Sequence, residues 1–185
     1  MQERCLGVPL LAGDSISESI LLCSHDNFMF MADGWKMDYG GHDSKFRDNI
    51  VYHGTGSFHG GNDGQNCVNA WPMVPGHGCE WTGNKCVLPK SNNLFGLIAG
   101  GCDCPGPAFP AKRFNASDPT GQGPQSECGV KFGHNEYFTH NGSGTANQCG
   151  DFDSDWKGKN EPDSKIDTLP TDDELLSWAR EKLDM

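Results

Sequence analysis

One segment of the chain, from Asp33 to Asp43, gathers side chains that can move protons and bind cations. Its sequence is Asp33-Gly34-Trp35-Lys36-Met37-Asp38-Tyr39-Gly40-Gly41-His42-Asp43. Lys36, Tyr39 and His42 are candidate catalytic acids or bases. The carboxylates of Asp33, Asp38 and Asp43 are candidate metal ligands, because carboxylate oxygens suit Ca²⁺. In the alternative interpretation, Trp35 and Tyr39 are packing residues and the charged side chains form a solvated face.

A second polar cluster follows closely in the sequence. His53 is the fourth candidate for proton transfer, and the glycine-rich segment 54–66 carries His59 and Gln65. Together with Trp35, these two side chains are candidates for binding a substrate. The two clusters come close together if adjacent repeats of the chain stack in register. The alternative is a flexible polar loop without a function.

A repeated pattern predicts the elements that position these residues. It consists of an apolar residue, two variable residues, Asn, one variable residue and two apolar residues. The clear copies contain Asn49, Asn84 and Asn135, and a weaker copy contains Asn27 and begins with Ser24. Each copy indicates two β-strands joined by a turn at Asn, which tolerates left-handed backbone angles. Such units must stack to bury their apolar sides, and the stacked asparagines can form a ladder.

This pattern resembles the right-handed parallel β-helix of the pectate-lyase-like superfamily over roughly residues 20–150. The resemblance implies an all-β fold, a right-handed parallel β-helix solenoid over residues 1–150 with long loops at 54–66 and 101–127. A β-sandwich with asparagine-containing turns is the alternative. Tyr39-Gly40-Gly41-His42-Asp43 is also similar to a segment of the alginate C5-epimerases, which implies that Tyr39 and His42 form an acid/base pair.

Residues 151–185 differ in composition from the repeats. Residues 151–170 are polar and acidic, which predicts a linker or a strap along the stack. Thr171-Asp172-Asp173-Glu174 is a capping box, and apolar residues follow at helical spacing. The pattern predicts an α-helix over 171–184. Because a solenoid needs a cover over its last coil, we expect this helix to cap the stack.

Nine cysteines predict disulfide bonds and an oxidising compartment. Cys86 occupies an apolar position of the repeat, so it can also be read as a small buried hydrophobic residue. Asn115-Ala116-Ser117 and Asn141-Gly142-Ser143 are glycosylation sequons. Together these features predict an extracellular or cell-surface glycoprotein of eukaryotic type. No signal peptide follows Met1, so we expect the chain to be the C-terminal portion of a longer protein, or the product of a mis-started reading frame.

The formal net charge of −11 argues against nucleic-acid binding, which depends on Lys and Arg side chains that neutralise phosphates. No apolar run approaches the length of about 18 residues that a membrane-spanning helix needs. An acidic ligand would have to be held through a bridging cation, and Ca²⁺ is the one cofactor that the composition suggests. The expected partner is a polysaccharide, and the expected state is a monomer.

Two functions fit this sequence. The first is a polysaccharide lyase or C5-epimerase that acts on uronate-containing glycans, with proton abstraction next to a neutralised carboxylate. The second is a non-catalytic extracellular β-helix that binds glycans or serves as a rigid structural module. Convergence of Lys36, Tyr39, His42 and His53 in one groove would favour the enzyme. Burial of Tyr39 and His42 would favour the non-catalytic module.

Overall fold

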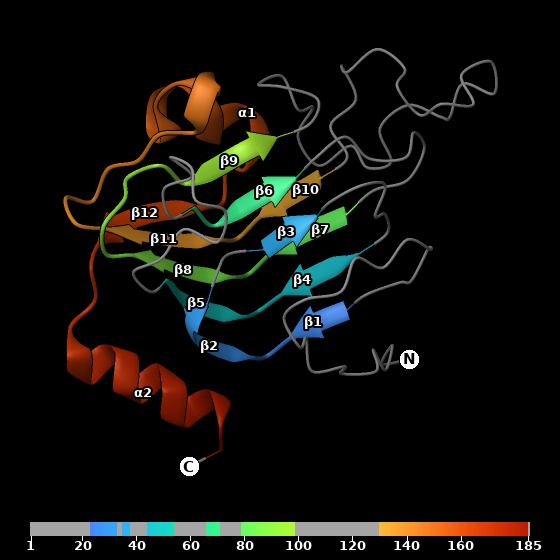
Figure 1. The fold of residues 1–185 in the computed structure, drawn as a ribbon. Helices are drawn as coiled ribbons and strands as arrows, with labels where there is room; N and C mark the ends of the chain where they lie inside the picture. The colour runs from blue at the N-terminus through green and yellow to red at the C-terminus, as the bar shows by residue number, and fades with distance from the viewer. Residues whose placement is uncertain are drawn as a thin grey trace.

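The computed structural model describes residues 23–32, 35–37, 44–53, 66–70, 79–98 and 130–184. In these ranges the chain is mostly β-strand (Figure 1). The strands are β1 (Cys23–His25), β2 (Phe28–Ala32), β3 (Trp35–Met37), β4 (Lys45–Arg47), β5 (Ile50–His53), β6 (Val68–Ala70), β7 (Cys79–Thr82), β8 (Lys85–Leu88), β9 (Phe95–Ile98), β10 (Val130–Gly133), β11 (Glu136–Thr139) and β12 (Lys165–Thr168). The helical elements are η1 (Asn147–Cys149), η2 (Phe152–Lys157), α1 (Gly158–Asn160) and α2 (Asp172–Lys182).

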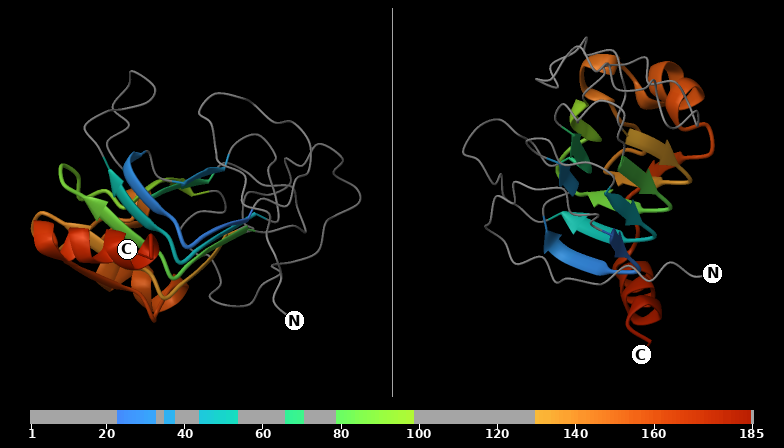
Figure 2. Two further views of the ribbon diagram at one scale, coloured as in Figure 1. Left: turned by 90° about the horizontal axis from the view of Figure 1, so that it is seen from below. Right: turned by 90° about the vertical axis from the view of Figure 1, so that its right-hand side faces the viewer.

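All pairings between these strands are parallel, and they form three sheets. The strand orders are β1-β4-β7-β10 in the first sheet, β12-β11-β8-β5-β2 in the second and β3-β6-β9 in the third. Each coil, meaning one pass of the chain through the sheets, adds its strands beside those of the coil before. The sheets lie around a common interior (Figure 2). The predicted mostly β fold with parallel strands is confirmed.

A sharp corner joins the first sheet to the second in each coil. The residue before each repeat asparagine has a positive φ, which is 57° at Asp26, 55° at Asp48, 68° at Gly83 and 54° at His134. Glycine adopts this backbone freely, and Asp and His are among the few other residue types that adopt it repeatedly. The left-handed corner therefore explains which residue types precede asparagine in the repeat.

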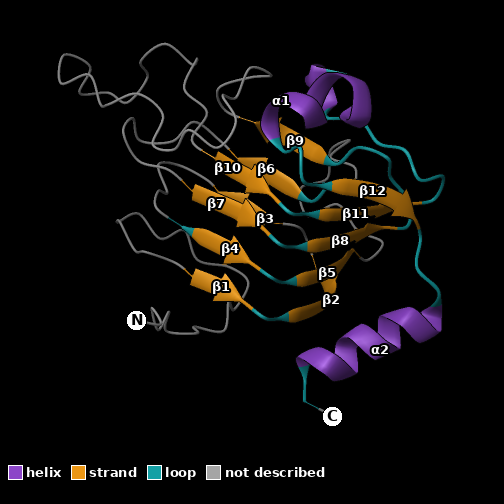
Figure 3. Ribbon diagram, turned by 180° about the vertical axis from the view of Figure 1, so that it is seen from behind, coloured by secondary structure: helices purple, strands orange, loops and turns teal. Residues whose placement is uncertain are grey.

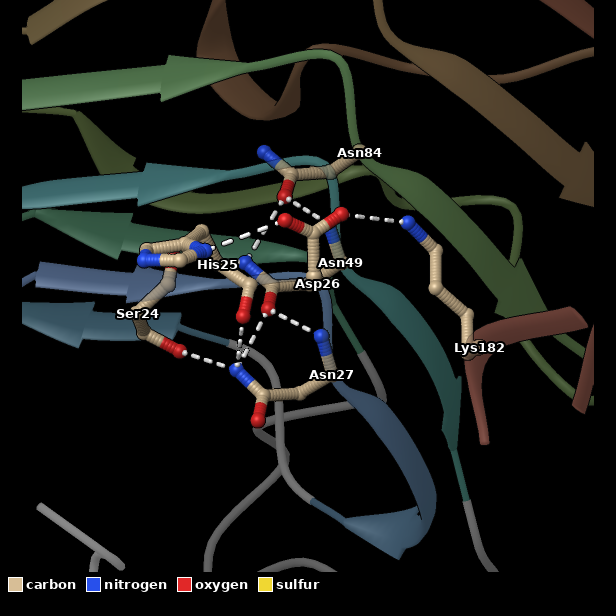
Figure 4. A network of polar contacts seen from close by, with 7 residues as sticks. All are labelled: Ser24, His25, Asp26, Asn27, Asn49, Asn84 and Lys182. Carbon is tan, nitrogen blue, oxygen red and sulfur yellow. Dashed lines mark hydrogen bonds and ion pairs between the residues drawn. The ribbon is translucent and has the colours of Figure 1, made fainter. Parts of the chain in front are cut away.

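The repeat asparagines stack into one hydrogen-bonded ladder, part of which is drawn in Figure 4. Asn27 Nδ2 donates to Asn49 Oδ1 at 2.9 Å, and Asn49 Nδ2 donates to Asn84 Oδ1 at 3.2 Å. Asn84 Nδ2 continues the series to Asn135 Oδ1 at 3.4 Å. The backbone N–H groups of Asn27, Asn49 and Asn84 also donate to the Oδ1 atom of the next asparagine, the same atom that accepts from their side chains. The ladder thus satisfies amide groups that the core would otherwise leave unpaired.

Aromatic side chains fill the interior and connect the sheets. Phe46 and Trp81, from neighbouring strands of the first sheet, stack with their ring centroids 4.8 Å apart. Phe95 of the third sheet lies 5.4 Å from Phe132 of the first sheet and 5.6 Å from Tyr137 of the second, between ring centroids. All five side chains are buried. One apolar core therefore holds the three sheets together.

A disulfide also lies in the interior. Cys67, just before β6, is bonded to Cys86 of β8, and both residues are fully buried. This bond confirms the prediction of disulfides and corrects the reading of Cys86 as a packing residue only. The repeat could not separate the two readings, because a half-cystine and a thiol both suit an apolar position. The bond fits an oxidising compartment.

Residues 151–170, which the composition predicts as a linker or a strap, cover one end of the stack (Figure 1). The π-helical turn η2 inserts Phe152 and Trp156 fully into the core. The Trp156 ring lies 5.0 Å from Phe95 and 5.4 Å from Phe132, between centroids. β12 then pairs with β11 and extends the second sheet. This segment closes the apolar core behind the last coil.

The helix α2 begins at the capping box that the sequence predicts. Thr171 Oγ1 accepts a hydrogen bond from Glu174 N at 3.3 Å, and Glu174 Oε2 accepts one from Thr171 N at 2.8 Å. The helix lies outside the second sheet (Figures 1 and 3). Trp178 packs there on Phe138 with 5.2 Å between ring centroids, and Lys85 Nζ lies 4.2 Å from the Trp178 ring.

The predicted placement of this helix over the last coil is wrong. No residue of α2 is buried, and Lys182 Nζ donates to Asp26 Oδ1 at 2.9 Å, at the corner of the first described coil (Figure 4). Leu176 and Leu183 are 53% and 59% exposed, so these apolar side chains of the helix region do not seal a core. None of the helices in the described ranges combines the length and apolar character needed to cross a membrane.

Replacing Asn84 with Ala should destabilise the protein strongly, because Asn84 Oδ1 accepts from Asn49 and Asn84 Nδ2 donates to Phe46 O at 2.9 Å. The loss leaves buried groups without partners, at about 1–3 kcal/mol for each. We expect Asn84→Ala to lower the unfolding free energy in urea by about 3 kcal/mol or more. Asn27→Ala, at the exposed end of the ladder, is the matched control and should cost less than about 1 kcal/mol. Equal losses in the two variants would contradict the ladder.

Replacing Gly83 with Ala should also destabilise the fold, because Gly83 has a φ of 68° and an added Cβ would overlap Asp48 Oδ1. We expect a loss of about 1–2 kcal/mol in unfolding free energy, the cost of a left-handed L-residue. Gly133→Ala is the control, since a Cβ there has no neighbour within 4 Å. That variant should be neutral or slightly stabilising. A neutral Gly83→Ala variant would refute the corner argument.

Candidate functional site

The described ranges contain three of the residues that the sequence predicts for the site. Trp35 and Lys36 lie in β3, and His53 is the last residue of β5. The other seven predicted residues lie outside the described ranges, and they are Asp33, Asp38, Tyr39, His42, Asp43, His59 and Gln65. Their roles in proton transfer, metal binding and substrate binding therefore stay predictions.

The strand register places the flanks of the two predicted clusters on neighbouring coils. β2 pairs with β5 so that Ala32 lies opposite His53. β3 pairs with β6 so that Lys36 lies opposite Asn69. The connections 33–34 and 54–65 thus both join the second sheet to the third, one coil apart. This in-register stacking is the condition under which the two clusters are expected to lie close together.

His53 lies inside the stack rather than on its surface. It is 3% exposed, and burial lowers the pKa of its imidazole from 6.5 to about 4. The ring is therefore neutral at pH 7. Its Nε2 atom has no hydrogen-bond partner in the described part of the structure. His53 shares the inner face of β5 with the buried Val51, so its position favours packing over contact with a ligand.

The best connected polar cluster in the described ranges is centred on a carboxylate that the sequence analysis does not single out. Glu161, which follows α1, is fully buried. Its Oε1 accepts from Trp156 Nε1 at 2.8 Å, and its Oε2 accepts from Asn135 Nδ2 at 3.1 Å. Tyr137 donates its hydroxyl to the same carboxylate at 3.1 and 3.2 Å. Ser164 Oγ accepts from the Asn135 backbone N–H at 2.9 Å.

Glu161 and Ser164 take the place of a further asparagine at the end of the ladder. Ser164 accepts from the backbone of Asn135, and Glu161 accepts from its side chain. Burial raises the pKa of Glu161, although its hydrogen bonds offset part of that rise. Burial and the nearby carboxylate also raise the pKa of Tyr137. Both side chains are 0% exposed, so this cluster supports the fold and does not meet a substrate.

A polar pocket lies on the surface where the chain leaves β8 and β11. Its volume is about 470 Å³, and its lining consists of Pro89, Lys90, Ser91, Asn92 and His140. The ammonium, hydroxyl, amide and imidazole groups are donors or acceptors that suit a hydroxyl-rich or anionic ligand. Sequence reasoning missed this pocket because its residues come from two turns that are distant in the chain.

No group of three or more His, Cys, Asp or Glu side chains within the described ranges is arranged to hold a metal ion. The predicted ligands Asp33, Asp38 and Asp43 lie outside those ranges, so the Ca²⁺ site stays a prediction. Comparisons of the chain with family models, with curated proteins and with solved structures give no match. A function must therefore be inferred from the residues and their arrangement alone.

The raised pKa of Glu161 predicts a pH dependence of stability. The folded protein binds this proton more tightly than the unfolded chain, whose pKa is near 4.5. Its contribution to stability is therefore greatest at low pH and falls as the pH rises from about 4.5 through the raised value. The free energy of unfolding can be measured in urea across this pH range for the wild type and for Glu161→Gln. The wild-type value minus the variant value should decrease as the pH rises.

Glu174→Gln is the control for this measurement. The hydrogen bonds from Thr171 lower the pKa of Glu174, so its contribution is lost as the pH falls, with a slope of the opposite sign. A difference for Glu161→Gln that stays flat or increases with pH would contradict the assigned environment of the buried carboxylate.

Proposed function

We propose that the chain is a right-handed parallel β-helix of the pectate-lyase-like kind, and that it is a secreted glycoprotein that binds and processes uronate-containing glycans. The observation that carries this proposal is the parallel, in-register stacking of coils in three sheets with an asparagine at each described corner between the first and second sheets. The buried disulfide between Cys67 and Cys86 supports the secreted location.

The proposed substrate surface is built from the two connections that join the second sheet to the third, from β3, and from the segment 38–43 that follows β3 in the chain. Ala32 opposite His53, and Lys36 opposite Asn69, fix these connections on neighbouring coils. Neighbouring parallel strands lie about 4.8 Å apart, a spacing comparable to the length of a sugar ring. A polysaccharide that lies along the stack would meet Trp35, His59 and Gln65 as binding groups on successive coils.

The proposed reaction removes the proton beside a uronate carboxylate. Ca²⁺ held by Asp33, Asp38 and Asp43 would neutralise that carboxylate and acidify the neighbouring C–H bond. Lys36, Tyr39 or His42 then takes the proton. In an elimination, the C–O bond to the next sugar breaks, a C=C bond forms, and the departing oxygen receives a proton. In an epimerisation, a proton returns to the same carbon from the opposite face.

A non-catalytic glycan-binding module is the second candidate, and one observation favours it. Phe30 of β2 is 65% exposed and stacks on Tyr52 of β5, with 5.1 Å between ring centroids and 18° between planes. Sugar rings bind to flat aromatic faces of this kind through their apolar C–H surfaces. The burial of His53 also removes one proposed acid/base group from the surface.

Incubation of the oxidised protein with a panel of polyuronates, with and without Ca²⁺, tests the enzyme. We expect ultraviolet absorbance from unsaturated products, or a change in proton NMR that reports epimerisation. Tyr39→Phe or His42→Ala should lower the rate by about 100-fold or more, the usual weight of general acid–base catalysis. His134→Asn should leave the rate unchanged, because His134 is an exposed corner residue on another coil and Asn tolerates its φ of 54°.

Binding without turnover, weakened by Phe30→Ala and unaffected by Tyr39→Phe, would favour the non-catalytic module. A folded protein that neither binds nor turns over any member of the panel would overturn the proposed function.

A further inference from the structure

Asn141 differs from the asparagines of the ladder because it lies in an exposed turn. The turn follows β11 and is closed by a hydrogen bond from Gly142 N to Thr139 O at 3.4 Å. Asn141 and Ser143 are exposed. With Gly142 between them, they form the sequence Asn-Gly-Ser, which has the Asn-X-Ser pattern of an N-glycosylation acceptor. The pattern therefore lies at the surface, where such a modification needs to be.

The hydrogen bonds of this turn leave the acceptor nitrogen unused. Asn141 Oδ1 accepts from Ser143 N at 3.3 Å and lies 3.4 Å from Thr139 Oγ1, whose single proton goes mainly to Ser143 O. Within the described part of the chain, Asn141 Nδ2 and the Ser143 hydroxyl make no hydrogen bond. In contrast, Asn49 Nδ2 donates two bonds inside the ladder. A group attached to Asn141 Nδ2 would therefore break no hydrogen bond of the fold.

The backbone holds this turn in one orientation. Gly142 has a φ of 66°, and a Cβ at that position would lie 3.3 Å from both Thr168 N and Thr168 Cγ2. The middle residue of the pattern is thus packed against β12, and glycine is the residue that fits. Thr139 Oγ1 adds a bond to Ser143 O at 2.8 Å. The Asn141 side chain is consequently presented outward from a fixed support.

We propose that Asn141 carries an N-linked glycan. The donor is an oligosaccharide linked to a lipid diphosphate, and the catalyst is the oligosaccharide transferase of the secretory pathway. A bond forms between Asn141 Nδ2 and C1 of the first sugar, while the bond from C1 to the diphosphate oxygen breaks. The lipid diphosphate leaves, and a base of the transferase takes one Nδ2 proton. This inference rests on the secreted location in the proposed function.

The attachment point also gives the glycan a defined neighbourhood. His140, the preceding residue, lines the polar pocket together with Lys90 and Asn92. The first sugars therefore begin beside this pocket, where ammonium, amide and imidazole groups can bond to their hydroxyls. The pocket then serves as a cradle for the protein's own glycan, and the proposed substrate surface uses other parts of the chain, namely residues 33–43 and 54–65.

The test is expression of the full chain behind a cleavable secretion signal in a eukaryotic cell line. We expect a fraction of the chain in whole-cell extract to migrate more slowly and to return to the lower band after peptide N-glycosidase treatment. Peptide mass spectrometry should show Asn141 converted to Asp by that enzyme. Asn141→Gln and Ser143→Ala should each abolish this conversion, whereas Ser143→Thr, which preserves the acceptor pattern, should retain it.

The same measurement is made in an Asn115→Gln background, so that the second sequon does not contribute to the band shift. Asn141 that stays unconverted in chains that have entered the secretory pathway, as shown by removal of the signal, would overturn the proposal. Export to the medium is scored separately. Glycosylated chain that stays inside the cell would count against the secreted function and would still support the modification of Asn141.

Discussion

The hydrogen-bonding demand of the buried corner asparagines is the constraint on which the rest of the structure depends. Asn49, Asn84 and Asn135 each accept two bonds at Oδ1 from the preceding coil. Each also donates one Nδ2 bond back to a carbonyl of the preceding coil, namely Ser24 O, Phe46 O and Trp81 O. The second Nδ2 bond of each goes to an acceptor in the part of the chain that follows, so each coil needs the next one in register with it. The strands on both sides of the corner are thereby held parallel.

The bonds from one asparagine side chain to the next all run in the same direction along the stack, so the last asparagine needs an acceptor beyond it. Residues 151–164 supply that acceptor and also close the apolar core. Trp156 contributes to both the apolar core and the end of the ladder, since its ring packs on Phe95 and its Nε1 donates to Glu161. Glu161 accepts the last forward bond of the ladder, from Asn135. With the core already closed at the β12 end by residues 151–164, α2 is not needed as a cover at that end. It lies instead on the outer face of the second sheet, held by Trp178 on Phe138.

The sequence predicts the features that repeat or depend on neighbouring residues. The asparagine corners, the mostly β character and the capping box of Thr171 and Glu174 are of this kind. The end of the ladder was not predictable, because Glu161 is one acidic residue among 25 and its partners are remote in the chain. The capping box fixes where α2 begins but not what it packs against. The burial of His53 could have been inferred, since it follows the inward-facing Val51 by two residues.

The interior of the stack leaves no room for chemistry in the described coils. Asparagines, aromatic rings, a disulfide and a neutral histidine occupy it, and each is buried. A ligand could therefore meet only the outer faces of the strands, as at the exposed Phe30 of β2, or the segments that connect them, and function generally concentrates on loops held by a rigid scaffold. In-register stacking places equivalent strand ends of neighbouring coils side by side, as with Ala32 beside His53. The corner hydrogen bonds that hold the coils in register thereby also set the spacing between equivalent positions along the stack.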